Sequence, residues 1–214
     1  MKSDTAAARV MGRPRDARAD RAILTAALEL MAERGVHELR MDDVAAHAGV
    51  GKAAIYRRYR SKDELVAGAV AALVSEITVP DTGSTRADLL ALMRDAVEVY
   101  TGSVAARAMP SLVEAMSRNP GLAEAVRDGF LAGRRAALHK VLERAIERGD
   151  LRPDLDIGLA LDVLGGPLFY RLLVTGGPLD DHLAESVAEL ILRGFAPDPS
   201  QGAISASTRK EHRP

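Results

Sequence analysis

The sequence predicts an all-α protein in which a small N-terminal head joins a larger helical C-terminal body. Apolar residues recur at helical spacing through most of the 214 residues. Clusters of Pro, Gly, Asn and Ser separate these periodic segments and mark turns. No stretch of useful length alternates apolar and polar residues as a strand would. We therefore expect helices throughout.

The chain is predicted to begin with a basic arm. Residues 1–16 carry small and polar side chains without periodicity, and we expect this arm to be disordered. A first helix follows from about Asp16 to Arg34, and Gly35 ends it. The helix supports the segment that comes next, because two short helices alone bury too little apolar surface to be stable.

The stretch from Met41 to Leu65 is predicted to form two short helices joined by a tight turn, followed by the start of a third helix. Gly49 is a residue that can end a helix with positive φ, and a second helix starts near Gly51. The third helix begins at Ser61, whose hydroxyl is a plausible N-cap, and Glu64 completes a capping box.

Two helices joined at a glycine turn form a helix-turn-helix, whose second helix lies in the DNA major groove. The outward face of that second helix is small at its start and basic at its end. The distribution of charge agrees with a head that binds nucleic acid. Residues 1–62 carry 13 Lys and Arg and 8 Asp and Glu, whereas residues 63–214 carry 16 Lys and Arg and 22 Asp and Glu. The alternatives are an ordinary helical hairpin with a solvated basic face, and a charge asymmetry that arose by chance.

The motif GVGKAAIYRRYRSKDEL, preceded by MDDVAAHA, resembles the DNA-binding domain of the TetR family of transcriptional repressors. The resemblance covers residues 20–70 closely and the rest only as an all-helical plan. It implies that the protein binds a palindromic operator as a homodimer, in response to a ligand. The family often has Ser in place of Gly51 and Thr in place of Met41, so two hydroxyl contacts to phosphate are lost here.

The resemblance assigns DNA contacts to the recognition helix and its surroundings. We expect Arg57 to contact a base, most naturally guanine, whereas Tyr56 and Lys62 contact phosphates. Asp42 is expected to cap the first helix of the motif. The arginines of the N-terminal arm either enter a minor groove or belong to a mobile terminus. The predicted DNA-contacting residues are Arg13, Arg15, Arg40, Gly51, Lys52, Ala53, Ala54, Tyr56, Arg57, Arg58 and Lys62.

The body is predicted to be helical from the break at Pro80–Ser84 onward. The head spans residues 17–65 and the body residues 66–195, and residues 196–214 form a disordered tail. Pro110 is placed at the start of a short helix, and either Asp154 or Asp156 caps a later one. The helix Ser61–Ile77 is expected to link head and body. The expected helices of the body run over Thr85–Ala106, Met109–Arg118, from the Asn119-Pro120-Gly121 break to Arg148, Asp156–Val174 and Leu179–Phe195.

The helix Asp156–Val174 is apolar nearly all round, so it must be buried on more than one side. Asp162 and Arg171 argue against a membrane span. We predict that this helix and the last one pair with their copies across a twofold axis; a fully intramolecular core is the alternative. Gly165-Gly166-Pro167 either kinks the helix or permits close approach of another backbone. The predicted interface residues are Leu159, Val163, Pro167, Tyr170, Leu183, Val187, Leu190 and Ile191.

The family resemblance also implies a small-molecule effector inside the body. Aromatic residues make up 3% of the chain, which favours an aliphatic or mixed-polarity ligand. Each candidate pocket residue could equally be plain core, because methionines fill irregular space in both settings. The candidates are Met93, Tyr100, Met109, Met116, Phe130 and Phe169.

Other classes of function find little support in the sequence. The motifs of nucleotide-binding loops, zinc proteases and serine hydrolases are absent, and the five histidines have no metal-ligand spacing. We therefore expect no cofactor, no metal and no enzymatic activity. The chain has no cysteine and no apolar leader segment, which favours a cytoplasmic protein with no membrane partner. The remaining alternative is a helical interaction module whose basic patch binds an acidic protein surface.

Overall fold

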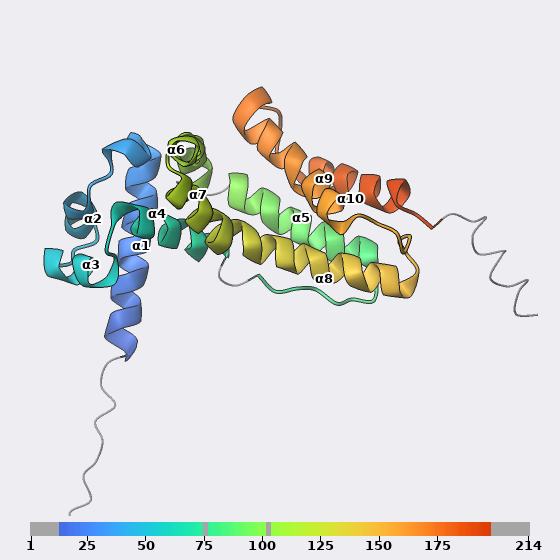
Figure 1. Ribbon diagram of the computed structural model, residues 1–214, viewed down its shortest axis with the longest axis horizontal. Coiled ribbons are helices and arrows are strands. Elements are labelled where there is room, and N and C mark those ends of the chain that lie inside the picture. Colours follow the sequence, from blue (N-terminus) through green and yellow to red (C-terminus); the bar gives the residue numbers. More distant parts are fainter. Residues whose placement is uncertain (1–12, 75–76, 102–103, 198–214) are drawn as a thin grey trace, which may run out of the picture.

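The computed structural model describes the backbone of residues 13–74, 77–101 and 104–197, and the side chains of these residues apart from 13–16 and 74. Within these ranges the secondary structure is helical and contains no strand, as predicted. The molecule is elongated, with a head formed by the first helices at one end and a helical body at the other (Figure 1).

The head is built around α1 (Arg13–Glu38). This helix begins three residues before the predicted start, so part of the expected disordered arm is helical, while residues 1–12 lie outside the described residues. Gly35 interrupts α1 with φ 81°, at the predicted end. Val36 and Leu39 then turn back into the core, where they are 2% and 4% exposed.

The remaining helices of the head are short. They are α2 (Met41–His47), α3 (Lys52–Arg58) and α4 (Lys62–Ala71), the last extended by a turn of 3-10 helix, η1 (Ala72–Val74). The Ser61 hydroxyl accepts from the Glu64 amide at 3.1 Å, and the Glu64 carboxylate accepts from the Arg60 amide at 2.7 Å. The predicted Ser61 cap of α4 is therefore confirmed, whereas the Glu64 carboxylate binds the amide of Arg60 and not that of the N-cap residue, as a capping box would require.

Two helices connect the head to the body. They are α6 (Val104–Arg118), which packs on α1, and α7 (Pro120–Val126), which packs on α4. A π-helical turn, η2 (Arg127–Leu131), continues α7. A Cβ at Gly129 in this turn would lie only 3.0 Å from the Ala71 Cβ, so the glycine allows the turn to approach α4 closely.

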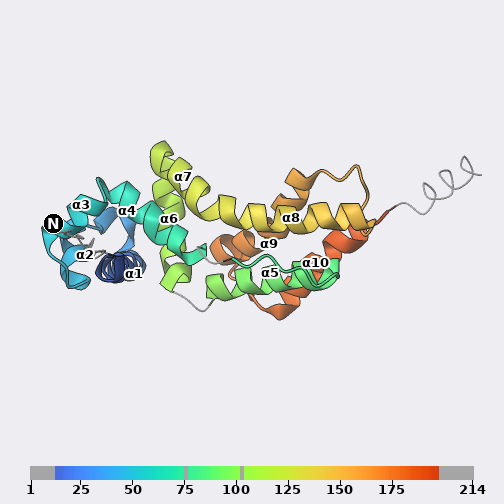
Figure 2. The same ribbon diagram turned by 90° about the horizontal axis from the view of Figure 1, so that it is seen from below.

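The body is a bundle of long helices. Its members are α5 (Thr85–Thr101), α8 (Ala132–Arg148), α9 (Ile157–Tyr170) with the π-helical turn η3 (Arg171–Thr175), and α10 (Asp181–Gly194). Helix α5 packs on α8 and α10, while α9 packs on α8 and α10 (Figure 2). The Asp156 carboxylate accepts from the Leu159 amide at 3.0 Å, so Asp156 is the cap of α9.

Two predicted helix boundaries between Thr85 and Arg118 are wrong. Pro110 lies inside α6 rather than at its start, and α5 ends at Thr101 rather than at Ala106. A proline inside a helix costs one backbone hydrogen bond. Burial of Ala108 and Leu112 against the head offsets that loss, and the Pro110 ring lies on the exposed side of α6.

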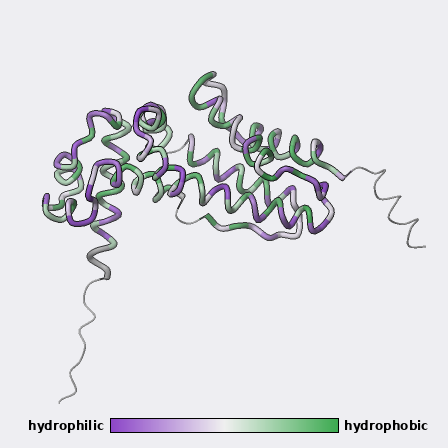
Figure 3. Tube along the Cα trace, in the orientation of Figure 1, coloured by the Kyte–Doolittle hydropathy of each residue, from purple (hydrophilic) through white to green (hydrophobic). Residues whose placement is uncertain are grey.

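Helix α9 is less buried than its composition requires. By length and composition alone, Ile157–Thr175 is the one helix in the described part of the chain that could span a membrane, with mean hydropathy 1.6, but only 22% of it is buried. Its far end projects from the body as a hydrophobic segment, green in Figure 3. The side chains of Leu159, Tyr170 and Val174 are 51%, 59% and 68% exposed.

Candidate nucleic-acid interface and body cavity

The turn between α2 and α3 is fixed by backbone hydrogen bonds. Gly49 has φ +66°, the Val50 amide donates to the Ala45 carbonyl at 2.9 Å, and the Gly49 amide donates to the Ala46 carbonyl at 3.2 Å. This pair of bonds is a Schellman motif, which ends a helix and turns the chain sharply. The angle between α2 and α3 is thus set by the backbone and by the conformational freedom of one glycine.

Helix α3 has one buried and one exposed face. Ile55 is fully buried and anchors the helix to the head, whereas Tyr56 is 53% exposed. Lys52, Ala53 and Arg57 are exposed on the same helix, and Ala54 is half-buried. Gly51 precedes the helix in extended conformation with no side chain above the helix start. The arrangement leaves room for a close backbone approach at Gly51 and places a phenol and a guanidinium further along.

Asp42 holds two of the predicted DNA contacts. The Lys52 ammonium donates to one oxygen of this carboxylate at 2.6 Å, and the Tyr56 hydroxyl lies 3.4 Å from the other. The hydrogen bond with Lys52 lowers the pKa of Asp42, and the same bond raises the pKa of Lys52. The predicted capping role of Asp42 is wrong, because Arg40 is the N-cap position and Asp42 lies within the first turn of α2.

Two predicted contacts are directed elsewhere. The Arg58 side chain is only 14% exposed and its Nε lies 2.5 Å from the Asp20 carboxylate of α1. Arg58 therefore ties the recognition helix to α1 and is not part of the exposed face. The Lys62 ammonium donates to the carbonyls of Val36 and His37 at 3.2 and 3.3 Å. These two hydrogen bonds stabilise the C-terminal end of α1.

The predicted contacts outside α3 are only partly described. Arg40 is exposed beside the start of α2. Arg13 and Arg15 belong to the first turn of α1, and their side chains lie outside the described residues.

The predicted dimer residues divide into two sets. Leu183, Val187 and Ile191 are at most 4% exposed, because this stripe of α10 covers α5 within the same chain. Their side chains are therefore covered within one chain and are not available at its surface. Val163 and Pro167 are half-buried. The exposed apolar side chains on this side of the body are Leu159, Tyr170, Val174 and Leu190.

A cavity of about 350 Å³ lies between α5, α8 and α9. Three predicted pocket residues, Met93, Tyr100 and Phe169, line it. The other three do not. Met109 and Met116 lie on α6 near the head, and Phe130 packs edge-on behind Tyr100 with ring centroids 6.3 Å apart. The further lining residues are Leu92, Ala96, Leu131, Arg134, Arg135, Leu138, Leu161, Asp162, Leu164, Gly165, Gly166 and Leu168.

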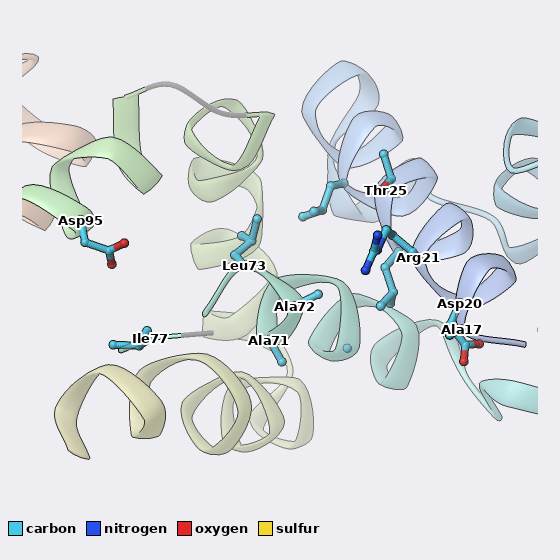
Figure 4. Close-up of a pocket in the computed structure, with 12 residues that line it drawn as sticks. Ala17, Asp20, Arg21, Thr25, Ala71, Ala72, Leu73, Ile77 and Asp95 are labelled. Atoms are coloured by element: carbon cyan, nitrogen blue, oxygen red, sulfur yellow. The ribbon is translucent and has the colours of Figure 1, made fainter. Parts of the chain in front are cut away.

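A second, open groove of about 1,030 Å³ separates head and body. Figure 4 shows Arg21 entering it from α1 and Asp95 facing it from α5, with Ala72 and Leu73 between them at the end of α4. Asp95 also accepts from Arg134 at 3.0 Å, and Arg134 lines the body cavity. The sequence did not suggest this groove, because its walls come from segments far apart in the chain.

Sequence reasoning also missed the polar residues of the cavity. The Arg134 guanidinium lies 6.0 Å from the centre of the Tyr100 ring, and Arg135 donates to Asp162 at 2.7 Å. The only signal available was the pair of adjacent arginines on one helix and a lone aspartate on an apolar one.

Comparisons with known proteins agree with this architecture. A model described as "Bacterial regulatory proteins, tetR family" matches residues 23–69, and one described as "Tetracyclin repressor-like, C-terminal domain" matches residues 79–191. An uncharacterised HTH-type transcriptional regulator of Bacillus subtilis, YdeS, is 34% identical over 185 residues, which cover 86% of this chain and 91% of the relative. A DNA-binding transcriptional repressor TetR of Mycobacteroides abscessus is 33% identical over 178 residues, covering 80% and 93%.

Solved structures of similar fold agree with the matches of the family models. The crystal structure of a TetR family transcription regulator is 34% identical, with a TM-score of 0.68, and the match covers 84% of this chain and all of that one. The regulator FadR of Bacillus subtilis, in complex with stearoyl-CoA, has a TM-score of 0.66 over 82% of this chain and 98% of that one. At 21% identity, the second likeness concerns the fold alone.

Proposed function

Because the chain belongs to the TetR family of bacterial transcriptional regulators, we propose that it is a ligand-responsive repressor that binds a palindromic operator as a homodimer. The family consists of regulators that bind DNA, and it is not a class of enzymes. The interaction-module alternative is not favoured by these matches.

The observation that carries the proposal is the outward face of α3. Arg57 and Tyr56 are exposed on a short helix that a Schellman turn holds at a fixed angle. Arginine can donate two hydrogen bonds to O6 and N7 of guanine, which makes Arg57 our candidate for base recognition. Lys52, Tyr56 and Arg40 are candidates for phosphate contacts, and the alanines at 53 and 54 offer apolar contact to a thymine methyl.

In the proposed complex, Asp42 must give up its partners. A carboxylate beside a DNA phosphate is repelled, and the phosphate takes over Lys52 and Tyr56. In the free protein, Asp42 thus holds the side chains of Lys52 and Tyr56 in place, and this competition lowers the affinity for DNA.

A homodimer is supported by the face that α9 and α10 leave exposed. Four large apolar side chains there are more than half exposed in one chain. A twofold axis through that face would cover them and would present two copies of α3 to successive major grooves, about 34–36 Å apart.

The body cavity supports a small-molecule effector that acts on the head. Arg134 lines the cavity, and its partner Asp95 lines the groove between head and body. A ligand that contacts Arg134 therefore acts on a residue pair that reaches the groove. The cytoplasm is the compartment in which such a regulator meets both DNA and effector.

The proposal is tested by fluorescence anisotropy on the intergenic DNA beside the gene and on random duplex. The Arg57→Ala variant should lose about 5- to 150-fold in affinity for the operator and lose preference at one base position. The Asp42→Asn variant should bind about two- to fivefold more tightly, because an exposed ion pair that competes with phosphate is removed.

The matched control is Arg107→Ala, which removes the same charge from the exposed side of α6. It should stay within about twofold of wild type, since surface substitutions away from a site change little. Equal losses for Arg57→Ala on all sequences would make Arg57 a phosphate contact only. A wild-type protein that binds both duplexes equally would overturn the repressor assignment.

A further inference from the structure

The body cavity is small and mostly aliphatic. At about 350 Å³ it lies near the lower limit of ligand pockets. It has more than twice the volume of an apolar cavity that holds benzene, so it admits a ligand of roughly a dozen non-hydrogen atoms. Its apolar walls come from Leu92, Met93, Leu138, Leu164 and Phe169.

One hydrogen-bond donor in this wall lacks an acceptor. Tyr100 is 3% exposed and lines the cavity, and its hydroxyl forms no hydrogen bond with any residue that the structure describes. The neighbouring Arg134 guanidinium lies 6.0 Å from the centre of the Tyr100 ring and is already paired with Asp95. A donor in an apolar wall without a partner is costly, and an acceptor oxygen from a ligand would satisfy it.

The protonation state of Tyr100 suits this role. Burial raises the pKa of Tyr100 to about 12. The hydroxyl is therefore a donor throughout the physiological pH range.

The charges around the cavity are already balanced. Arg134 is paired with Asp95 at 3.0 Å, and Arg135 is paired with Asp162 at 2.7 Å. A carboxylate ligand would have to displace Asp95 or enter a low-dielectric cavity without a counter-ion, which is unfavourable. A neutral carbonyl accepts two hydrogen bonds and carries no charge that needs neutralising.

We propose that the effector is a neutral aliphatic compound of roughly a dozen non-hydrogen atoms whose carbonyl oxygen accepts from the Tyr100 hydroxyl. Its carbon chain lies among the leucines of α5, α8 and α9. This inference rests on the proposed function for its regulatory meaning, but ligand binding itself is measured without DNA.

The test compares three probes of about a dozen non-hydrogen atoms each: 2-undecanone, decanoate and dodecane. Binding to the full chain is measured by calorimetry and by the shift in melting temperature. The ketone should bind at least about tenfold more tightly than decanoate and dodecane, since each unmatched buried polar or charged group opposes binding.

Tyr100→Phe removes one donor without changing the shape of the wall. It should reduce ketone affinity about fivefold and leave dodecane affinity unchanged. The matched control is Tyr59→Phe, which alters a half-buried tyrosine of the head outside the cavity. This control should bind all three probes as wild type does.

Each other outcome overturns the inference. Tighter binding of decanoate would make the cavity an anion site. Equal binding of all three probes, or equal ketone affinity in wild type and Tyr100→Phe, would show that the Tyr100 hydroxyl does not select the ligand. No binding up to the solubility limit would remove the cavity as a site for this class of compound.

A separate measurement distinguishes this failure from failure of the proposed function. Operator binding is measured in the absence of any probe. Specific DNA binding without ketone binding would overturn the ligand inference alone. Ketone binding by a protein that does not discriminate its operator would overturn the repressor assignment and leave the ligand inference standing.

Discussion

Tyr100 is a phenol enclosed by aromatic rings. Its ring centre lies 6.3 Å from that of Phe130 and 5.3 Å from that of Phe169. Burial raises its pKa to about 12, while the nearby Arg134 guanidinium acts in the opposite direction. In an unfolded chain a tyrosine titrates near pH 10. Folding is therefore linked to the proton on this hydroxyl.

This linkage predicts a loss of stability in alkali. A raised folded pKa gives stability that is complete below the unfolded value and disappears as pH rises through the folded value, here between about pH 10 and 12. A shift of about two units corresponds to about 3 kcal/mol. Urea unfolding at pH 8, 10, 11 and 12 should show the free energy of unfolding falling across this window, and falling less steeply in Tyr100→Phe.

The control for this prediction is Tyr56→Phe, which changes a half-exposed tyrosine and should keep the wild-type slope. Partial burial also raises the pKa of Tyr59, so some slope remains in Tyr100→Phe. Parallel slopes in wild type and Tyr100→Phe would contradict the assignment of the titration to Tyr100.

The sequence predicted side-chain directions well wherever helical periodicity decides them. Ile55 points inward and Tyr56 outward, as the i, i+4 spacing of α3 requires. Periodicity failed for Arg58, because Asp20 on α1 turns the side chain aside. It failed equally for Lys62, which binds carbonyls at the end of α1. Such partners lie far away in sequence, so no local pattern predicts them.

The start of α5 is anchored by a buried carboxylate. Asp88 is fully buried and accepts from the amide and the hydroxyl of Thr82, at 3.0 and 2.7 Å. Arg148 at the end of α8 lies 3.9 Å from the other Asp88 oxygen and donates to Thr85 at 2.8 Å. These contacts fix the segment that enters the body against α5 and α8.

The Asp88→Ala variant should therefore lose about 1–3 kcal/mol of unfolding free energy, because two donors of Thr82 lose their acceptor at a part-buried site. Urea unfolding at pH 7 measures the loss. Asp154→Ala serves as control, since its pair with Arg152 is 3.5 Å long and its side chain 76% exposed. A loss for Asp88→Ala no larger than that of the control would show that Thr82 finds other partners at no cost.

Helix boundaries were predictable where the local chemistry is strong. Ser61, Gly35, Gly49 and Asp156 all act where the sequence places them. Pro110 misled the prediction, because a proline usually marks a helix start, whereas here packing of α6 on α1 keeps it within the helix. Propensity is local, and tertiary burial overrides it.

The proposed DNA-binding face and the proposed dimer face lie at opposite ends of the molecule. Figure 1 shows α3 at the outer end of the head and α9 with α10 on the opposite part of the molecule. The family was predictable because a specific motif indicates it. The all-helical plan was predictable because apolar residues recur at helical spacing. The dimer interface stays a prediction. Sequence alone could not tell whether the apolar stripe of α10 covers its own α5 or a second chain, since the composition of the stripe suits either partner.

The exposed apolar side chains of Leu159, Tyr170, Val174 and Leu190 predict the oligomeric state. Wild-type protein at about 1 µM should have twice the monomer mass of 22.8 kDa in sedimentation equilibrium, because burying large apolar side chains drives association. Tyr170→Glu places a charge in the proposed interface, on a side chain 59% exposed in one chain. It should weaken the dimer at least about 100-fold, since an unpaired buried charge is strongly unfavourable, and it should weaken operator binding with it. Val113→Glu, at an exposed apolar position on α6, should remain dimeric and bind DNA. A wild-type protein that stays monomeric even when mixed with its operator would contradict the twofold arrangement, because a single head reaches only one half-site.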